Sequence, residues 1–116
     1  MLHLATFQSD ITPPIGHPLC AGWYPPVTAV SDPLSALGVV LVPEGEPPIV
    51  LCALDWSELS NGDYRRWRAD LAEAVKTTPE RVAVHCVHAH DTPWADRDAQ
   101  DILDAHGWPG VIMAGD

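Results

Sequence analysis

Two histidines separated by one residue, His88 and His90, are the side chains whose type and spacing most directly indicate chemistry. Residues at i and i+2 of an extended segment project to the same side, and imidazole is the commonest protein ligand for zinc. The pair therefore predicts a metal site. Ordinary loop histidines that only make hydrogen bonds are the alternative. Asp91 follows directly and could orient a ligand imidazole by accepting its hydrogen bond, or could begin a turn with Thr92 and Pro93.

Asp55 is a further candidate, because it follows six apolar residues and a carboxylate placed there is costly unless it is solvated or paired. It is predicted either to belong to the metal site, as a ligand or as a hydrogen-bond partner of one, or to lie at the N-terminus of the next helix. Ser57 and Glu58 favour the helix alternative. Cys52 and Cys86 lie in apolar runs, so we expect buried, inert thiols at both positions.

The elements that must position these residues are predicted from the periodicity of apolar side chains. Helical spacing predicts a helix over residues 61–75, and proline at 79 ends it. Strand patterns occur over residues 2–11, 35–42, 48–54 and 81–87. The Gly/Pro turn at 43–47 predicts an antiparallel hairpin, and strand, helix and strand over residues 48–87 predict a right-handed βαβ unit. The fold class is therefore α/β with a mixed sheet, and its almost wholly apolar strands predict cover on both faces.

This topology predicts where the site lies. The carboxyl ends of parallel strands meet at one edge of a sheet, so Asp55, His88, His90 and Asp91 are expected to converge there. Residues 12–33 contain six prolines and predict a long irregular loop, of a kind that is often functional. Trp23, Trp56 and Trp94 fall in loops at the same edge and predict an apolar substrate groove, with core packing as the alternative.

The end of the sequence predicts two shorter elements. Residues 100–106 are expected to form a helix capped by Gly107, and the apolar run 111–116 has the pattern of a new strand. A domain seldom ends on an apolar strand. The sequence therefore indicates one domain over residues 1–116, truncated at its C-terminus.

Composition excludes some classes of function. The 116 residues carry 16 acidic and 6 basic side chains, and the net charge of −10 argues against binding to nucleic acid. No apolar run approaches the roughly 20 residues that span a bilayer, which predicts no transmembrane segment. The N-terminus lacks the basic and apolar regions of a signal peptide, which favours a cytoplasmic location. Nothing in the sequence indicates an oligomeric state.

Several segments, taken in order, resemble the N-terminal domain of the neutral/alkaline non-lysosomal ceramidases. They are D-I-T-P-P at 10–14, A-G-W at 21–23, D-P-L-S-A-L-G-V-V-L at 32–41, the strand ending at Asp55, and V-H-C-V-H-A-H-D-T-P at 84–93. In that family a later strand ends in T-H-T-H-S-G-P. The similarity extends over nearly the whole chain, and the order of the segments carries it more than any single motif.

The resemblance implies a zinc enzyme that hydrolyses the amide of an N-acyl sphingoid lipid, with His88 as a zinc ligand and His90 in the catalytic site. The substrate would be lipid-like or a small amide. Asp91 and Thr92 replace the family's serine and glycine, which bears on substrate contacts. The family's other ligands, a histidine, a glutamate and a tyrosine, fall beyond position 116, so this chain is expected to be incomplete as an enzyme by itself.

Two alternatives stay open from the sequence. The first is a different metallohydrolase built on a histidine pair at a strand end, acting on soluble amides or esters. The second is a truncated module that binds a partner and has no catalytic role. Members of the resembled family are often secreted, which leaves the compartment of the mature protein open.

Overall fold

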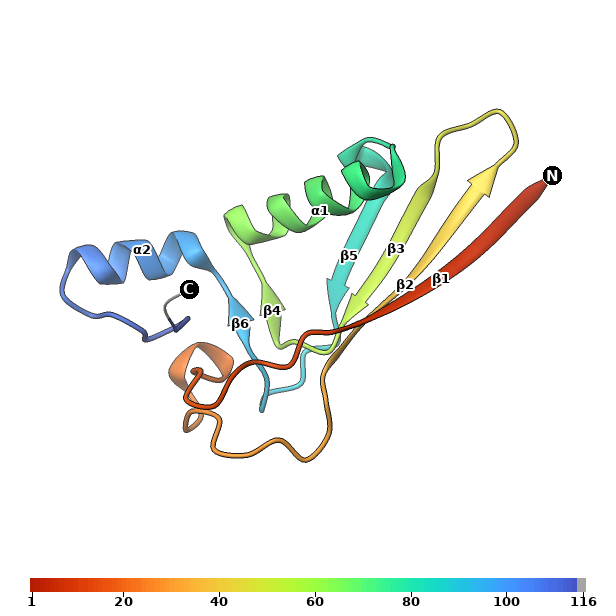
Figure 1. The fold of residues 1–116 in the computed structure, drawn as a ribbon. Helices are drawn as coiled ribbons and strands as arrows, with labels where there is room; N and C mark the ends of the chain where they lie inside the picture. The colour runs from red at the N-terminus through yellow and green to blue at the C-terminus, as the bar shows by residue number, and fades with distance from the viewer. Residues whose placement is uncertain (115–116) are drawn as a thin grey trace.

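A computed structural model, which describes residues 1–114, confirms the mixed α/β fold (Figure 1). Its main sheet has the strand order β1-β2-β3-β5, formed by β1 (Leu2–Asp10), β2 (Ser35–Pro43), β3 (Ile49–Leu54) and β5 (Val82–Cys86). β1 pairs antiparallel with β2 and β2 antiparallel with β3, whereas β3 and β5 are parallel. The predicted hairpin and the predicted parallel pair are both present, with boundaries within one residue or two of those expected.

Helix α1 (Asn61–Val75) connects the two parallel strands. It ends at Lys76, which takes the left-handed conformation (φ 59°, ψ 49°) and donates its backbone N–H to the last turn. Thr77 then fixes the helix end against the sheet, because its hydroxyl donates to the carbonyl of Pro48, 2.7 Å away. The short 3-10 helix η2 (Pro79–Arg81) leads into β5. The proline that ends the predicted helix thus also begins the return to the sheet.

A second, two-stranded sheet was not predicted. It consists of β4 (Glu58–Leu59) and β6 (Trp94–Ala95), which pair in parallel, and α2 (Arg97–Ala105) follows it. α2 begins three residues before the predicted helix because the Asp96 carboxylate caps it, accepting from the N–H of Ala99 at 3.0 Å. Gly107 has φ +82°, as expected after a helix end.

The strand predicted at 111–116 is wrong for residues 111–114, which form bends and coil; residues 115 and 116 lie outside the described part of the chain. The reason is the amide of Gln100, whose side chain is 1% exposed. Its Oε1 accepts from the N–H groups of Ile112 and Met113, at 2.7 and 3.1 Å. Backbone donors that a strand ladder would use are therefore taken up by one buried side chain.

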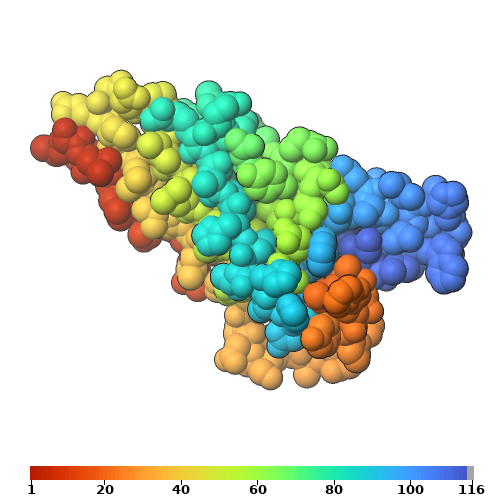
Figure 2. Space-filling model, turned by 180° about the vertical axis from the view of Figure 1, so that it is seen from behind, coloured from red at the N-terminus to blue at the C-terminus, as the bar shows by residue number. Residues whose placement is uncertain are grey.

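The proline-rich loop at 12–33 forms a separate lobe (Figure 2). Its only helical part within the described residues is the 3-10 turn η1 (Cys20–Gly22). Within the loop, the N–H of Gly16 donates to the carbonyl of Val27. The N–H of Cys20 donates to the carbonyl of Thr92 and so attaches the loop to the rest of the chain. The predicted irregular excursion is confirmed, and its two ends enter and leave at the edge of the sheet where β3 and β5 end.

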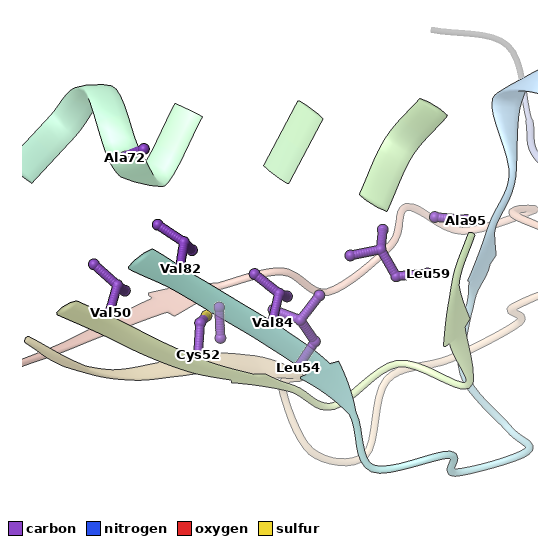
Figure 3. Close-up of a cluster of buried hydrophobic side chains, with 9 residues drawn as sticks. Val50, Cys52, Leu54, Leu59, Ala72, Val82, Val84 and Ala95 are labelled. Atoms are coloured by element: carbon purple, nitrogen blue, oxygen red, sulfur yellow. The ribbon is translucent and has the colours of Figure 1, made fainter. Parts of the chain in front are cut away.

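The core lies between α1 and one face of the main sheet. Val50, Cys52 and Leu54 of β3 are 0% exposed, and together with Val82 and Val84 they point toward the helix that carries Ala72 (Figure 3). The opposite face is open: Leu37 and Leu51 are 49% and 47% exposed. The prediction of cover on both faces is therefore wrong within residues 1–114, because the chain supplies one crossover helix and it covers one face. No described helix is long and apolar enough to cross a membrane.

Candidate metal and catalytic site

The segments that follow β3 and β5 run side by side past the edge of the sheet. The N–H of Val87 donates to the carbonyl of Leu54, at 3.0 Å, and the N–H of His88 donates to the carbonyl of Trp56, at 3.1 Å. These bonds continue the parallel pairing beyond the last ladder residues. They bring the histidine pair next to the segment that begins with Asp55, as the topology predicts.

The ring of His88 has a defined hydrogen bond. Its Nδ1 lies 2.8 Å from the carbonyl oxygen of Ser57. A carbonyl only accepts, so in the neutral ring Nδ1 carries the hydrogen and Nε2 keeps its lone pair. Metal-binding histidines are commonly oriented in this way, by donating their other N–H to a backbone carbonyl. The backbone of His88 is left-handed (φ 64°), a conformation that costs energy for a residue with a side chain.

His90 lies against His88. The two ring centroids are 4.9 Å apart, and the rings are nearly perpendicular at 87°. The Tyr24 ring from the proline-rich loop contacts His90 from another side, with centroids 6.1 Å apart. Both histidines are exposed. The structure therefore brings the predicted pair together and adds Tyr24, which the sequence did not single out although it adjoins the A-G-W segment of the resemblance.

Asp55 makes a structural contact. Its carboxylate accepts from the N–H of Ser35 at 2.8 Å, and its own N–H donates to the carbonyl of Ser35 at 3.0 Å. This pair of bonds joins the beginning of β2 to the end of β3. α1 begins later, at Asn61 after Ser60, so Asp55 does not lie in its first turn. The predicted role beside the metal has no supporting contact among the hydrogen bonds of residues 1–114.

Asp91 lies in the turn that follows the histidine pair. It is exposed, and the turn is closed by the hydroxyl of Thr92, which donates to the carbonyl of Ala89 at 2.6 Å. This geometry matches the turn-forming alternative. Asp91 also lines a cavity of about 380 Å³, together with Asp32 and prolines of the loop.

Ser57 and Cys20 lie on the buried side of the site. Ser57 is 0% exposed, and its hydroxyl lies 3.5 Å from the sulfur of Cys20.

Burial raises the pKa of the Cys86 thiol to about 11, with smaller contributions from the Glu58 carboxylate and from Cys52. Burial likewise raises the pKa of the Cys52 thiol. Both thiols stay protonated near neutral pH, as expected of inert cysteines. Cys52 is buried as predicted, whereas Cys86 is only half-buried.

The tryptophans lie in two environments. Trp56 and Trp94 line a cavity of about 290 Å³ beside the sheet edge, which Trp67 of α1 and Met113 also line. Trp56 is held by its indole N–H, which donates to the carbonyl of Ile11 at 3.0 Å, and by an edge-on contact with Trp67. Trp23 is 83% exposed and lies outside this lining. Two of the three tryptophans expected in an apolar groove therefore share one cavity.

The donor set for a metal is partial. Within residues 1–114 no group of three or more histidine, cysteine, aspartate or glutamate side chains is arranged to hold a metal ion. A catalytic zinc normally has three protein ligands. His88 fits one of these places, because its tautomer leaves Nε2 available, and the other ligands are not assembled by the described residues.

The chain was also compared with known proteins. No family model, no curated protein and no solved structure matches it.

Proposed function

We propose that this chain forms the N-terminal part of a zinc-dependent amide hydrolase of the neutral ceramidase type, in which His88 is a zinc ligand. The observation that carries the proposal is the hydrogen bond from His88 Nδ1 to the carbonyl of Ser57, which leaves Nε2 available for a metal. The position of the pair at the carboxyl edge of parallel strands supports it, because α/β proteins commonly place their sites there. The ordered set of segments that resembles the ceramidases supplies the reaction class.

In this proposal the two histidines have different roles. His88 holds the metal, and zinc, when bound, supplies Lewis-acid activation of the amide carbonyl. His90 is the group that exchanges a proton with the reacting amide, since its ring contacts His88 and is exposed to an incoming substrate. Tyr24 restricts the position of the His90 ring from the side of the loop.

The cavity beside the sheet edge bears on the substrate class. Its lining of tryptophan, proline and methionine side chains suits an apolar group, and its volume of about 290 Å³ is small for a ligand pocket. Neither His88 nor His90 lines this cavity, so a substrate whose amide lies at the histidines would reach it only with an apolar portion, which a lipid-like amide has. The further zinc ligands would be supplied by polypeptide outside residues 1–114.

Cobalt substitution tests the ligand assignment without requiring turnover. In the longer parent protein we expect one tightly held Zn²⁺, which Co²⁺ can replace with the visible absorption of a four-coordinate site. His88→Ala should abolish retention of the metal. His90→Ala should retain it and lose hydrolysis of an N-acyl amide. His106→Ala, at an exposed position after α2, is the matched control and should change neither. Unchanged metal content in His88→Ala would overturn the assignment.

A non-catalytic binding module is a second candidate, favoured by the absence of a three-donor group among the described residues. It predicts that the melting temperature does not respond to zinc, either in the unmodified chain or in the double variant His88→Ala/His90→Ala. The zinc enzyme predicts that the parent protein is stabilised by zinc and that the double variant loses this stabilisation, because a ligand that binds only the folded state raises its stability. Calorimetry of both proteins with and without zinc separates the two candidates.

A further inference from the structure

The open face of the main sheet is a continuous apolar surface. Register fixes its members, because directly paired residues on neighbouring strands project to the same face. One row across the sheet is Thr6, Val39, Leu51 and Ala83, and neighbouring rows complete the surface. Its side chains are those of Leu2, Leu4, Thr6, Gln8, Asp10, Ser35, Leu37, Val39, Leu41, Pro43, Ile49, Leu51, Ala53, Ala83 and His85. We call this set the open sheet face.

Several large apolar side chains of this face are strongly exposed. Leu2 and Leu4 are 60% and 64% exposed, and Leu37 and Leu51 are each about half exposed. On the covered face, by contrast, three residues of β3 are 0% exposed. Apolar side chains that alternate between full burial and half exposure along one strand indicate a sheet built to be covered on both sides.

The open sheet face also has little charge. Of the 22 aspartate, glutamate, lysine and arginine residues of the chain, this set contains Asp10 alone, at the end of β1, where its carboxylate accepts from the N–H of Thr12. A nucleic acid or an anionic membrane would need cations here, and a basic peptide would need carboxylates. An apolar sheet face of this kind is covered either by a helix, as α1 covers the opposite face, or by a second apolar sheet.

The extent of the open sheet face is sufficient for association. Four strands spaced by about 4.8 Å and roughly 25 Å long have a footprint of roughly 500 Å². Two copies would bury roughly 1,000 Å² or more in total, which reaches the lower limit for a specific interface. Patches of this size on a monomer commonly mark protein–protein contacts.

We propose that the open sheet face is a self-association surface, on which two copies of this chain pack face to face in a two-fold symmetric dimer. Symmetry requires a surface that complements itself, and a largely apolar sheet face with its one carboxylate at a strand end does so. Two stacked sheets lie about 10 Å apart with side chains interdigitated, which suits the alternating leucine and alanine or valine positions of neighbouring strands. Interfaces of this modest area belong to weak, transient complexes, so we expect a dissociation constant in the micromolar range.

Sedimentation velocity over a concentration series tests this proposal with the 116-residue chain, in the presence of a chelator so that metal plays no part. We expect the mass to rise from 12.6 kDa toward twice that value as the concentration passes through the micromolar range. Leu51→Lys and, separately, Leu37→Lys should weaken dimerisation at least tenfold, because each dimer would then enclose two unpaired charges.

The matched control is Ile102→Lys, an apolar residue 64% exposed on α2 and away from the open sheet face. It should dimerise like the unmodified chain, and circular dichroism should show that all variants keep the fold. A chain that stays monomeric to several hundred micromolar overturns the proposal. So does a dimer that persists unchanged in both lysine variants, because its interface would then lie elsewhere, for instance along the unpaired edge of β1.

Discussion

The two faces of the main sheet are made from the same strands and carry similar side chains, yet their surroundings differ. On one face Val50, Cys52 and Leu54 are wholly buried beneath α1, and on the other Leu37 and Leu51 are half exposed. Residues adjacent in the sequence therefore contribute unequally to folding. Burial by a neighbouring element, rather than hydrophobicity itself, determines how much an apolar side chain stabilises the chain.

The difference teaches how the candidate site is supported. Leu54 and Cys86 are the last residues of β3 and β5 on the covered face. The loops that carry Ser57 and His88 follow directly after them. A well-packed face thus fixes the backbone from which the histidine pair projects. The open face contributes little to that rigidity in an isolated chain, so the two faces can be tested separately.

The largest expected effect is on the covered face. Leu54→Ala removes a side chain that is 0% exposed and should lower the free energy of unfolding by about 3 kcal/mol. Leu51→Ala, three residues earlier on the open face, should lower it by about 1 kcal/mol or less, because the side chain is half exposed already. Urea unfolding followed by tryptophan fluorescence, at submicromolar protein where a dimer dissociates, measures both. Equal losses would contradict the inequality of the faces.

A smaller effect is expected where the covered face extends onto β1. A Cβ added at Gly38 would lie 1.9 Å from Cζ of Phe7, whose ring covers this glycine from the neighbouring strand. Gly38→Ala must displace that ring, and we expect a loss of about 2 kcal/mol. Ala83→Val adds two methyl groups on the open face and is the control, with an expected change below about 0.5 kcal/mol.

The double variant Phe7→Ala/Gly38→Ala sharpens this test. If the clash with the Phe7 ring is the cause, Gly38→Ala should lower the free energy of unfolding hardly at all once Phe7→Ala has removed the ring. The losses of the two single variants then do not add up to the loss of the double variant. Additive losses would instead mean that Gly38→Ala acts through the backbone. A loss below about 0.5 kcal/mol for Gly38→Ala alone would show that the edge strand moves aside easily.

Much of the fold could be predicted from the sequence because strong periodicity has one structural solution. The strand patterns and the helical spacing of residues 61–75 located all four main strands and α1. The parallel pairing then placed Asp55 and the histidine pair at one edge without any further information. Topology, once inferred, was a better guide to the site than any single motif.

The missed features depend on contacts that sequence patterns do not encode. β4 and β6 have two residues each, too few to show a period. The partner of His88 is a backbone carbonyl, and every residue has one, so Ser57 gave no signal of its own. Cover on both faces was inferred from composition, which records that a strand is apolar and not how many elements lie over it.

The smallest expected effect concerns pH and again separates the faces. Burial on the covered face raises the pKa of the Cys52 thiol above its ordinary value of 9.0. The Cys52 thiol therefore keeps its proton to a higher pH in the folded chain than in the unfolded chain. The stability that this difference contributes is complete below about pH 9 and is lost as the pH rises further. The loss by pH 10 is on the order of 1 kcal/mol at most, since one pH unit corresponds to an energy of that order. Cys52→Ala should lack this part of the alkaline decline, although its stability at pH 7 is lower.

The test is the difference between the unfolding free energies of the two proteins, measured from pH 7 to 10, because other alkaline titrations are common to both. A difference that stays constant would mean that the Cys52 thiol ionises as readily in the folded chain as in water, which its complete burial opposes.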